Sequence, residues 1–133
     1  CLYPNSSLAI KEANSRGFDN AVMRDGADNV VEFASSNLWL AKDGEVVTPS
    51  HNHTFLNGVT RQRVILLLTE CGIDVREREV KFEDVISADE VFSTGNLGKV
   101  LPVTRVEEHH FPVGPICLRA REAYFSFAAC NTI

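Results

Sequence analysis

The stretch "DNVVEFASSNLWLAKDGEVVTP", residues 28–49, places a single acid, Glu32, within a short apolar run. It is typical of a strand, a bend and a hairpin whose turn is formed by Asp43 and Gly44. An ionised carboxylate is costly to bury without a partner, so a buried Glu32 would need a cation, a hydrogen-bond donor or a proton. Glu32 is therefore a candidate binding residue, although a strand acid that faces water is the commoner case.

Size and composition indicate one globular domain covering residues 1–133. The 133 residues are 44% hydrophobic and 23% charged, which allows a sizeable core. The longest apolar run, Val64–Leu68, is far shorter than the roughly 20 residues that span a bilayer, so we expect no membrane segment. A net charge of -5 with scattered Lys and Arg argues against a nucleic-acid partner.

The cysteines and the first residue bear on compartment and completeness. The four cysteines have no CxxC spacing and no secretory leader precedes them, which predicts free thiols and a cytoplasmic location. The chain opens on Cys1 rather than on Met and enters a helical pattern within a few residues. We therefore expect this sequence to be the interior of a longer protein.

Strand and helix patterns are interspersed along the chain. Apolar spacing and turn residues predict helices within residues 4–18, 59–72, 82–88 and 113–130, and strands within 20–25, 30–34, 37–41, 45–49, 73–80, 89–94 and 99–106. Short hairpins occur beside longer crossovers. This mixture predicts a mixed sheet in an α/β or α+β domain.

Two glycine-rich turns are candidate anion sites. In "FLNGVTR", residues 55–61, a glycine directly precedes a helix start, where free N–H groups, the helix dipole and the Thr60 hydroxyl favour an anion. In "STGNLG", residues 93–98, backbone amides can converge beside Asn96. Each turn alone is more often a plain cap or strand connection. Together with Glu32, they suit a ligand with a phosphate at one end and a basic ring nitrogen at the other.

The same residues resemble a family signature. The strings "EFASSNLW" (residues 32–39), "VVT" (46–48) and "LNGVTR" (56–61) are similar to those of fold-type IV pyridoxal-phosphate enzymes, and among them of branched-chain amino acid aminotransferases. Trp39 stands where the family usually has Phe or Tyr. The resemblance implies the large domain of that fold, an α/β (α+β) pseudo-barrel of mixed sheet with flanking helices. It also implies that the N-terminal domain is missing.

The resemblance implies roles for the cofactor-binding residues. Glu32 would pair with the protonated pyridine nitrogen of pyridoxal 5'-phosphate, which keeps the ring an electron sink. The backbone amides of Val59 and Thr60, with the Thr60 hydroxyl, would hold the phosphate. Leu56 would pack against the ring.

Further residues are implied for cofactor and substrate. Asn96 stands where the family commonly has Thr as a second phosphate donor. The backbone around Asn96 and Leu97 would face the substrate carboxylate. Tyr3 would lie beside the cofactor oxygen and the substrate.

The resemblance places the family's Schiff-base lysine shortly before Tyr3, and hence upstream of Cys1. None of the four lysines of this chain falls at that position, namely Lys11, Lys42, Lys81 and Lys99. We therefore expect no catalytic residue within these residues and no transamination by them alone. The intact protein would be a homodimer that transaminates branched-chain L-amino acids with 2-oxoglutarate.

Other functions fit parts of the sequence. D-amino acid or amine transamination, and the aminodeoxychorismate lyase reaction, share the same cofactor residues. A non-enzymatic binding domain with an exposed Glu32 is a rival of another class. The pairs His51 and His53, and His109 and His110, raise the question of a metal site, but no acid or cysteine completes a ligand set, and surface loop positions explain them better.

Overall fold

The computed structural model describes residues 3–131, with Tyr3 described through its backbone alone. Its helices are α1 (Tyr3–Ser15), α2 (Val59–Glu70), α3 (Phe82–Ile86) and α4 (Pro115–Cys130). Its strands are β1 (Val22–Arg24), β2 (Val30–Phe33), β3 (Asn37–Lys42), β4 (Glu45–Pro49), β5 (Val75–Arg78), β6 (Glu90–Gly95), β7 (Lys99–Val103), β8 (Arg105–Val106) and β9 (His109–His110). Helices and strands are interspersed along the chain, as the sequence predicts.

The central sheet contains five strands in the order β5-β4-β3-β6-β7. The pair β4–β5 is parallel and the other pairs are antiparallel, which confirms the predicted mixed sheet. The tight turn between β3 and β4 has positive φ angles at Asp43 (51°) and Gly44 (81°), as a two-residue hairpin turn requires. The parallel pair needs a longer crossover, which contains α2.

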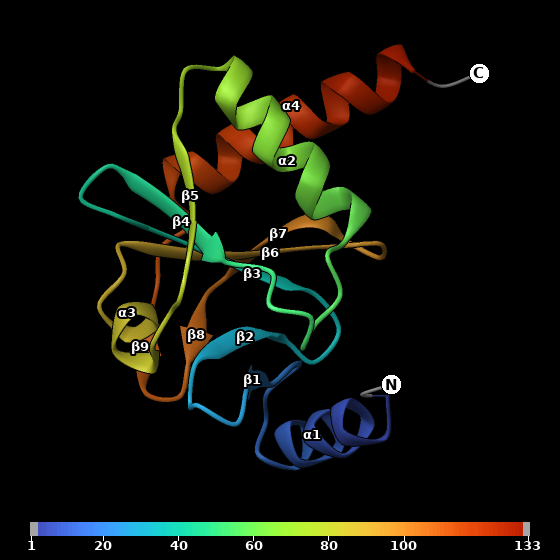
Figure 1. Ribbon diagram of the computed structural model, residues 1–133, viewed down its shortest axis with the longest axis vertical. Coiled ribbons are helices and arrows are strands. Elements are labelled where there is room, and N and C mark those ends of the chain that lie inside the picture. Colours follow the sequence, from blue (N-terminus) through green and yellow to red (C-terminus); the bar gives the residue numbers. More distant parts are fainter. Residues whose placement is uncertain (1–2, 132–133) are drawn as a thin grey trace.

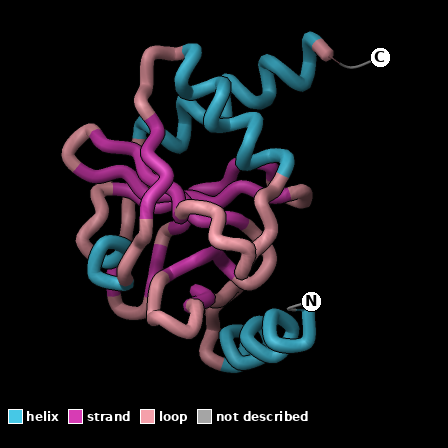
Figure 2. Tube along the Cα trace, in the orientation of Figure 1, coloured by secondary structure: helices cyan, strands magenta, loops and turns pink. Residues whose placement is uncertain are grey.

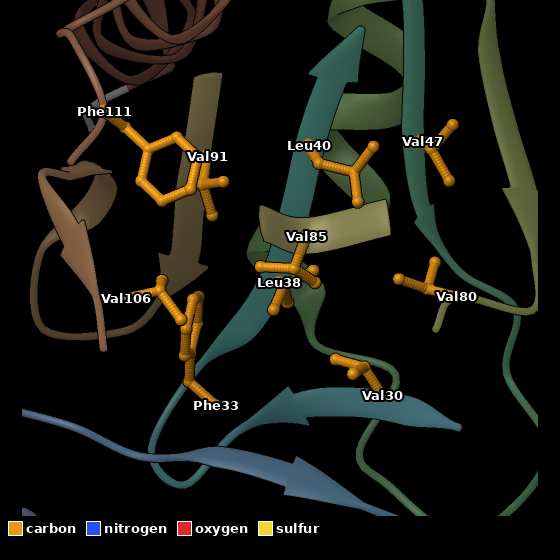
Figure 3. Packing of buried hydrophobic residues seen from close by; sticks show 10 residues of the cluster. All are labelled: Val30, Phe33, Leu38, Leu40, Val47, Val80, Val85, Val91, Val106 and Phe111. Carbon is orange, nitrogen blue, oxygen red and sulfur yellow. The ribbon is translucent and has the colours of Figure 1, made fainter. Parts of the chain in front are cut away.

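Both faces of this sheet are buried. Along β3, Leu38 and Leu40 belong to one hydrophobic core, whereas Trp39 and Ala41 belong to the other. Figure 1 shows α2 and α4 together on one face, with β1, β2, α3 and β8 on the opposite face. Figure 3 shows the core that contains Leu38 and Leu40, where side chains of the central sheet meet those of β2, α3 and β8. Alternate β3 residues therefore fill two separate cores.

The helix-covered core contains the unusual tryptophan. The Trp39 ring stacks on Phe92 with centroids 5.4 Å apart, and its Nε1 donates a hydrogen bond to Thr94 Oγ1 at 2.9 Å. A buried indole N–H needs an acceptor, and Thr94 provides it. Trp39 therefore takes the place of a smaller aromatic residue without an unsatisfied polar group.

The structure corrects two expectations about the later strands. Residues 99–106 do not form one strand, because β7 leaves the central sheet after Val103 and β8 pairs with β9. The Phe111 amide donates to the Thr104 carbonyl between them, which holds the bend. His109 and His110 therefore lie on a short exposed strand rather than in a loop.

The tube view in Figure 2 places α1 at the opposite end of the molecule from α2 and α4. Cys71, Cys117 and Cys130 are free thiols, as predicted, while Cys1 lies outside residues 3–131. Within that range no helix is long and apolar enough to cross a membrane.

Candidate functional site

A cavity of about 970 Å³ lies between β2, the start of α2, the β6–β7 turn and the first turns of α1. Five residues that the sequence singled out for one ligand line it: Glu32, Leu56, Val59, Thr60 and Asn96. Backbone sections far apart in the sequence thus meet at one site. Ser6, Ser7 and Ile10 of α1 add a wall that sequence reasoning missed.

Glu32 is half-buried in β2, opposite Met23 of β1. Within residues 3–131 its carboxylate forms no hydrogen bond or ion pair. Burial raises the pKa of Glu32 from its ordinary value of 4.5 to about 7. The acid is therefore poorly solvated and would ionise more readily beside a cation, in line with the expectation that a buried Glu32 needs a cation, a hydrogen-bond donor or a proton.

The N-terminus of α2 presents free donors to the same cavity. Gly58 is the N-cap and offers no side-chain hydrogen bond. The first helical backbone bond runs from the Gln62 amide to the Gly58 carbonyl at 3.0 Å, so the amides of Val59 and Thr60 are left for another acceptor. The helix dipole adds partial positive charge here. This end of the cavity can bind an anion.

Close packing explains Gly58. Its φ of -60° is open to any residue, but a Cβ at this position would overlap Asn37 Oδ1. The Asn37 Nδ2 donates to the Leu56 carbonyl at 2.8 Å, which ties the loop before α2 to the start of β3. The Asn in "EFASSNLW" therefore shapes the anion end of the cavity. Asn37 stands in that string, but the sequence alone did not predict a role for it.

Arg61 fixes the start of α2 through buried hydrogen bonds. The sequence did not predict this role. The Arg61 side chain is 1% exposed. The guanidinium donates to the Pro49 carbonyl at 2.9 Å, to Glu77 Oε1 at 2.6 Å and to Asn57 Oδ1 at 2.8 Å, and Nε lies 3.4 Å from Thr48 Oγ1. One buried cation thus joins α2 to β4 and β5. The presence of Thr48 and Arg61 in the signature strings was the available signal.

Only part of the second glycine-rich turn belongs to the cavity. Thr94, Gly95 and Asn96 line it, whereas Ser93 lines a separate cavity of about 720 Å³ beside α1. The Thr94 hydroxyl oxygen accepts the hydrogen bond from Trp39, and Leu97 is fully exposed outside the cavity lining. The Tyr3 side chain lies outside the described residues, so its predicted place beside the cofactor stays a prediction, as does the substrate contact of Leu97.

The histidines before α2 lie on an exposed loop. His51 Nε2 is 3.1 Å from the Phe55 carbonyl oxygen, and the His51 and His53 rings meet edge to face at 4.9 Å. In the part of the chain that the structure describes, no group of three His, Cys, Asp or Glu side chains is placed to bind a metal. His53 also lines the cavity.

Comparison with known proteins identifies the family. Residues 1–106 match the family described as amino-transferase class IV. The chain belongs to the class IV aminotransferases. Its match includes every element that lines the cavity, from α1 to the β6–β7 turn.

A curated relative in this class shows how much of a whole enzyme the chain covers. The branched-chain-amino-acid aminotransferase of Pseudomonas aeruginosa is 35% identical over 133 residues, which is 98% of this chain and 43% of that protein. The chain thus spans less than half the length of the curated relatives it matches.

Solved aminotransferase structures share the fold. An aminotransferase from Brucella abortus bound to the cofactor PLP has a TM-score of 0.94 and 48% identity, covering 97% of this chain and 46% of that one. A branched-chain aminotransferase from Thermoproteus uzoniensis with norvaline has a TM-score of 0.90 and 31% identity, covering 93% and 42%. The predicted fold, with its mixed sheet and flanking helices, is confirmed.

The raised pKa of Glu32 gives this class IV chain a pH-dependent stability. The folded state holds the Glu32 proton more tightly than the unfolded state, so the free energy of unfolding falls as pH rises from about 4.5 to about 7 and then stays level. At about 1.4 kcal/mol per pKa unit, reduced for partial solvent access, we expect Glu32→Gln to stabilise the chain by about 1–2 kcal/mol at pH 8. At pH 5 the gain should be less than half as large.

Urea unfolding of the unmodified chain and of Glu32→Gln, each at pH 5 and pH 8, measures this effect. Glu45→Gln is the matched control, because Glu45 is a strand glutamate that pairs with Arg76 at 3.2 Å and does not line the cavity. A gain for Glu32→Gln that is equal at the two pH values would contradict the argument.

Proposed function

We propose that this chain is the C-terminal cofactor-binding domain of a pyridoxal-phosphate-dependent aminotransferase of branched-chain L-amino acids that uses 2-oxoglutarate as amino acceptor. One observation carries the proposal: Glu32, an acid with no partner among residues 3–131, and the uncapped N-terminus of α2 line the same cavity. Such a cavity suits a ligand that is cationic at one end and anionic at the other.

The donor set fits pyridoxal phosphate. Its phosphate would be held by the amides of Val59 and Thr60 and by the Thr60 hydroxyl, with Asn96 adding side-chain donors. Its protonated ring nitrogen would face Glu32, and that cation would lower the pKa of Glu32 and remove the cost of ionising it. When bound, the cofactor supplies a ring that accepts electrons from the substrate α-carbon.

Each of these site residues then has a distinct role. Glu32 keeps the proton on the ring nitrogen, and the start of α2 fixes the phosphate and so the orientation of the ring. Leu56, which is 77% exposed on the cavity wall, would pack against the ring face and exclude water from it. We place Tyr3 and the backbone at Leu97 beside the substrate.

The proposed substrate follows from the relatives. The matched protein of Pseudomonas aeruginosa is named a branched-chain-amino-acid aminotransferase, and the Thermoproteus uzoniensis structure contains norvaline, an aliphatic amino acid. Initial rates of the full-length protein on leucine, D-alanine and an aromatic amine, each with 2-oxoglutarate, test it. We expect leucine to react fastest. Faster turnover of D-alanine or of the amine would favour the alternative transaminases, and pyruvate release from aminodeoxychorismate would favour the lyase.

The chain by itself should not transaminate. None of its lysines lines the cavity, so the group that would attach the cofactor and move the α-proton is not among the residues that form this site. Purified residues 1–133 should give no glutamate from leucine, 2-oxoglutarate and added pyridoxal phosphate, whereas the full-length protein should. Turnover by the chain alone would refute this prediction.

We also propose that the full-length protein is a cytoplasmic homodimer, as the family resemblance implies. Light scattering of the full-length protein would measure its mass in solution. A monomer with full activity would contradict the dimer.

A further inference from the structure

The turn between β6 and β7 holds a lysine in contact with the cavity wall. β6 and β7 pair up to Gly95 and Lys99, and residues 96–98 connect them. The Lys99 ammonium donates a hydrogen bond to Asn96 Oδ1 at 3.0 Å, and Asn96 lines the cavity. In residues 3–131 no carboxylate pairs with Lys99. Its positive charge is therefore not neutralised by a carboxylate in this part of the chain, and it can attract an anion that Asn96 binds.

This contact fixes which end of the Asn96 amide a ligand meets. An ammonium group has three donors and no acceptor, so only the carbonyl oxygen of the amide can bond to Lys99. With Oδ1 engaged, the side chain of Asn96 has the two N–H donors of Nδ2 left for a ligand. Without Lys99 the amide could turn and present its oxygen, which repels an anion.

The turn maintains this contact at a conformational cost. Lys99 has a φ of 59°, in the left-handed region that residues with a Cβ adopt at a cost of about 1–2 kcal/mol. Glycine or asparagine at position 99 would suit the backbone better, but neither could reach Asn96 with a charged donor.

We propose that Lys99 is a positioning residue for anion recognition: it holds the Asn96 amide with its N–H donors available and thereby increases affinity for the phosphate of the ligand. The inference rests on the proposed function and deepens it. The α2 N-terminus supplies one set of phosphate donors, and Asn96, held by Lys99, supplies another.

Three variants of Lys99 in the full-length protein separate its donor from its charge. Lys99→Arg keeps both, Lys99→Gln keeps a donor without the charge, and Lys99→Met keeps neither. The probe is pyridoxamine 5'-phosphate, whose binding needs no lysine attachment and is measured by titration calorimetry. We expect the Kd to rise about tenfold for Lys99→Met, about threefold for Lys99→Gln and less than twofold for Lys99→Arg.

Two controls separate positioning from a general structural or charge effect. Affinity for pyridoxamine, which has no phosphate, should be the same for the unmodified protein and Lys99→Met. In an Asn96→Ala background, Lys99→Met should change the Kd for pyridoxamine 5'-phosphate by less than twofold, since the amide it positions is gone.

The outcomes are distinguishable. A Kd unchanged by Lys99→Met, or a tenfold rise that persists in the Asn96→Ala background, would overturn the inference while leaving the proposed function intact. Failure of the unmodified full-length protein to bind pyridoxamine 5'-phosphate would overturn both.

Discussion

Replacing Glu32 by glutamine in the full-length protein should lower kcat for leucine transamination by roughly 10²–10³-fold, the range seen when one well-placed electrostatic group is removed from an active site. Glutamine has nearly the same shape as glutamate but carries no charge, so it cannot keep a proton on the ring nitrogen of the cofactor. Because the substrate contacts that we place at Tyr3 and Leu97 remain, KM for leucine should change far less than kcat. Steady-state kinetics with saturating cofactor measures both constants.

The matched controls for this experiment are Glu32→Asp and Glu45→Gln. Aspartate keeps the charge on a shorter side chain and should restore part of kcat, and Glu45 lies outside the cavity, so its variant should behave as the unmodified enzyme. The absorption spectrum of the bound cofactor should change in Glu32→Gln alone. Unchanged kcat and spectrum in Glu32→Gln would instead support a domain in which this acid has no role in catalysis.

Removing the Arg61 side chain should have the largest effect on stability. Arg61→Met keeps most of the buried aliphatic length but leaves the Pro49 carbonyl and Asn57 Oδ1 without their donors. An orphaned buried acceptor such as the Pro49 carbonyl costs about 1–3 kcal/mol, and the partly buried Asn57 Oδ1 adds less. We expect Arg61→Met to lower the free energy of unfolding by about 3 kcal/mol, as measured by urea denaturation of the chain.

Glu77→Gln is the matched control for Arg61. The Glu77 side chain is 47% exposed, so losing its ion pair with Arg61 should cost less than about 1 kcal/mol. Arg61→Lys keeps the charge without the planar fork and should lie between the two, which gives a graded result even if Arg61→Met does not fold. If Glu77→Gln destabilised the chain as much as Arg61→Met, the ion pair rather than the backbone contact would hold α2.

Most elements of the fold could be predicted because their signals are local. Pro4 at the start of α1, Gly58 before α2 and the Asp43–Gly44 turn each act within a few residues. The division of residues 99–106 into β7 and β8 could not be predicted. It depends on pairing with His109 and His110 and on the contact of Phe111 with Thr104, which local patterns do not reveal.

For the site, too, some residues could be singled out from the sequence and others could not. Glu32, Thr60 and Asn96, which line one cavity, could be singled out from the sequence because each carries the chemistry of a ligand contact in a recognisable string. Asn37 and Arg61 act on the site through the backbone they hold, at Leu56 and Pro49 respectively, and such roles appear only when the chain is folded. The interaction of Lys99 with Asn96 likewise depends on a left-handed backbone that no motif specifies.

The half-buried, unpaired carboxylate of Glu32 has an evolutionary consequence. Above neutral pH this acid makes the ligand-free chain less stable, and a bound cation reverses that effect. A lineage that had stopped binding its cofactor would gain stability from nearly any neutral substitution at this position, with nothing to oppose the change. The identity of residue 32 is thus a marker that separates descendants still using the site from those that keep only its scaffold.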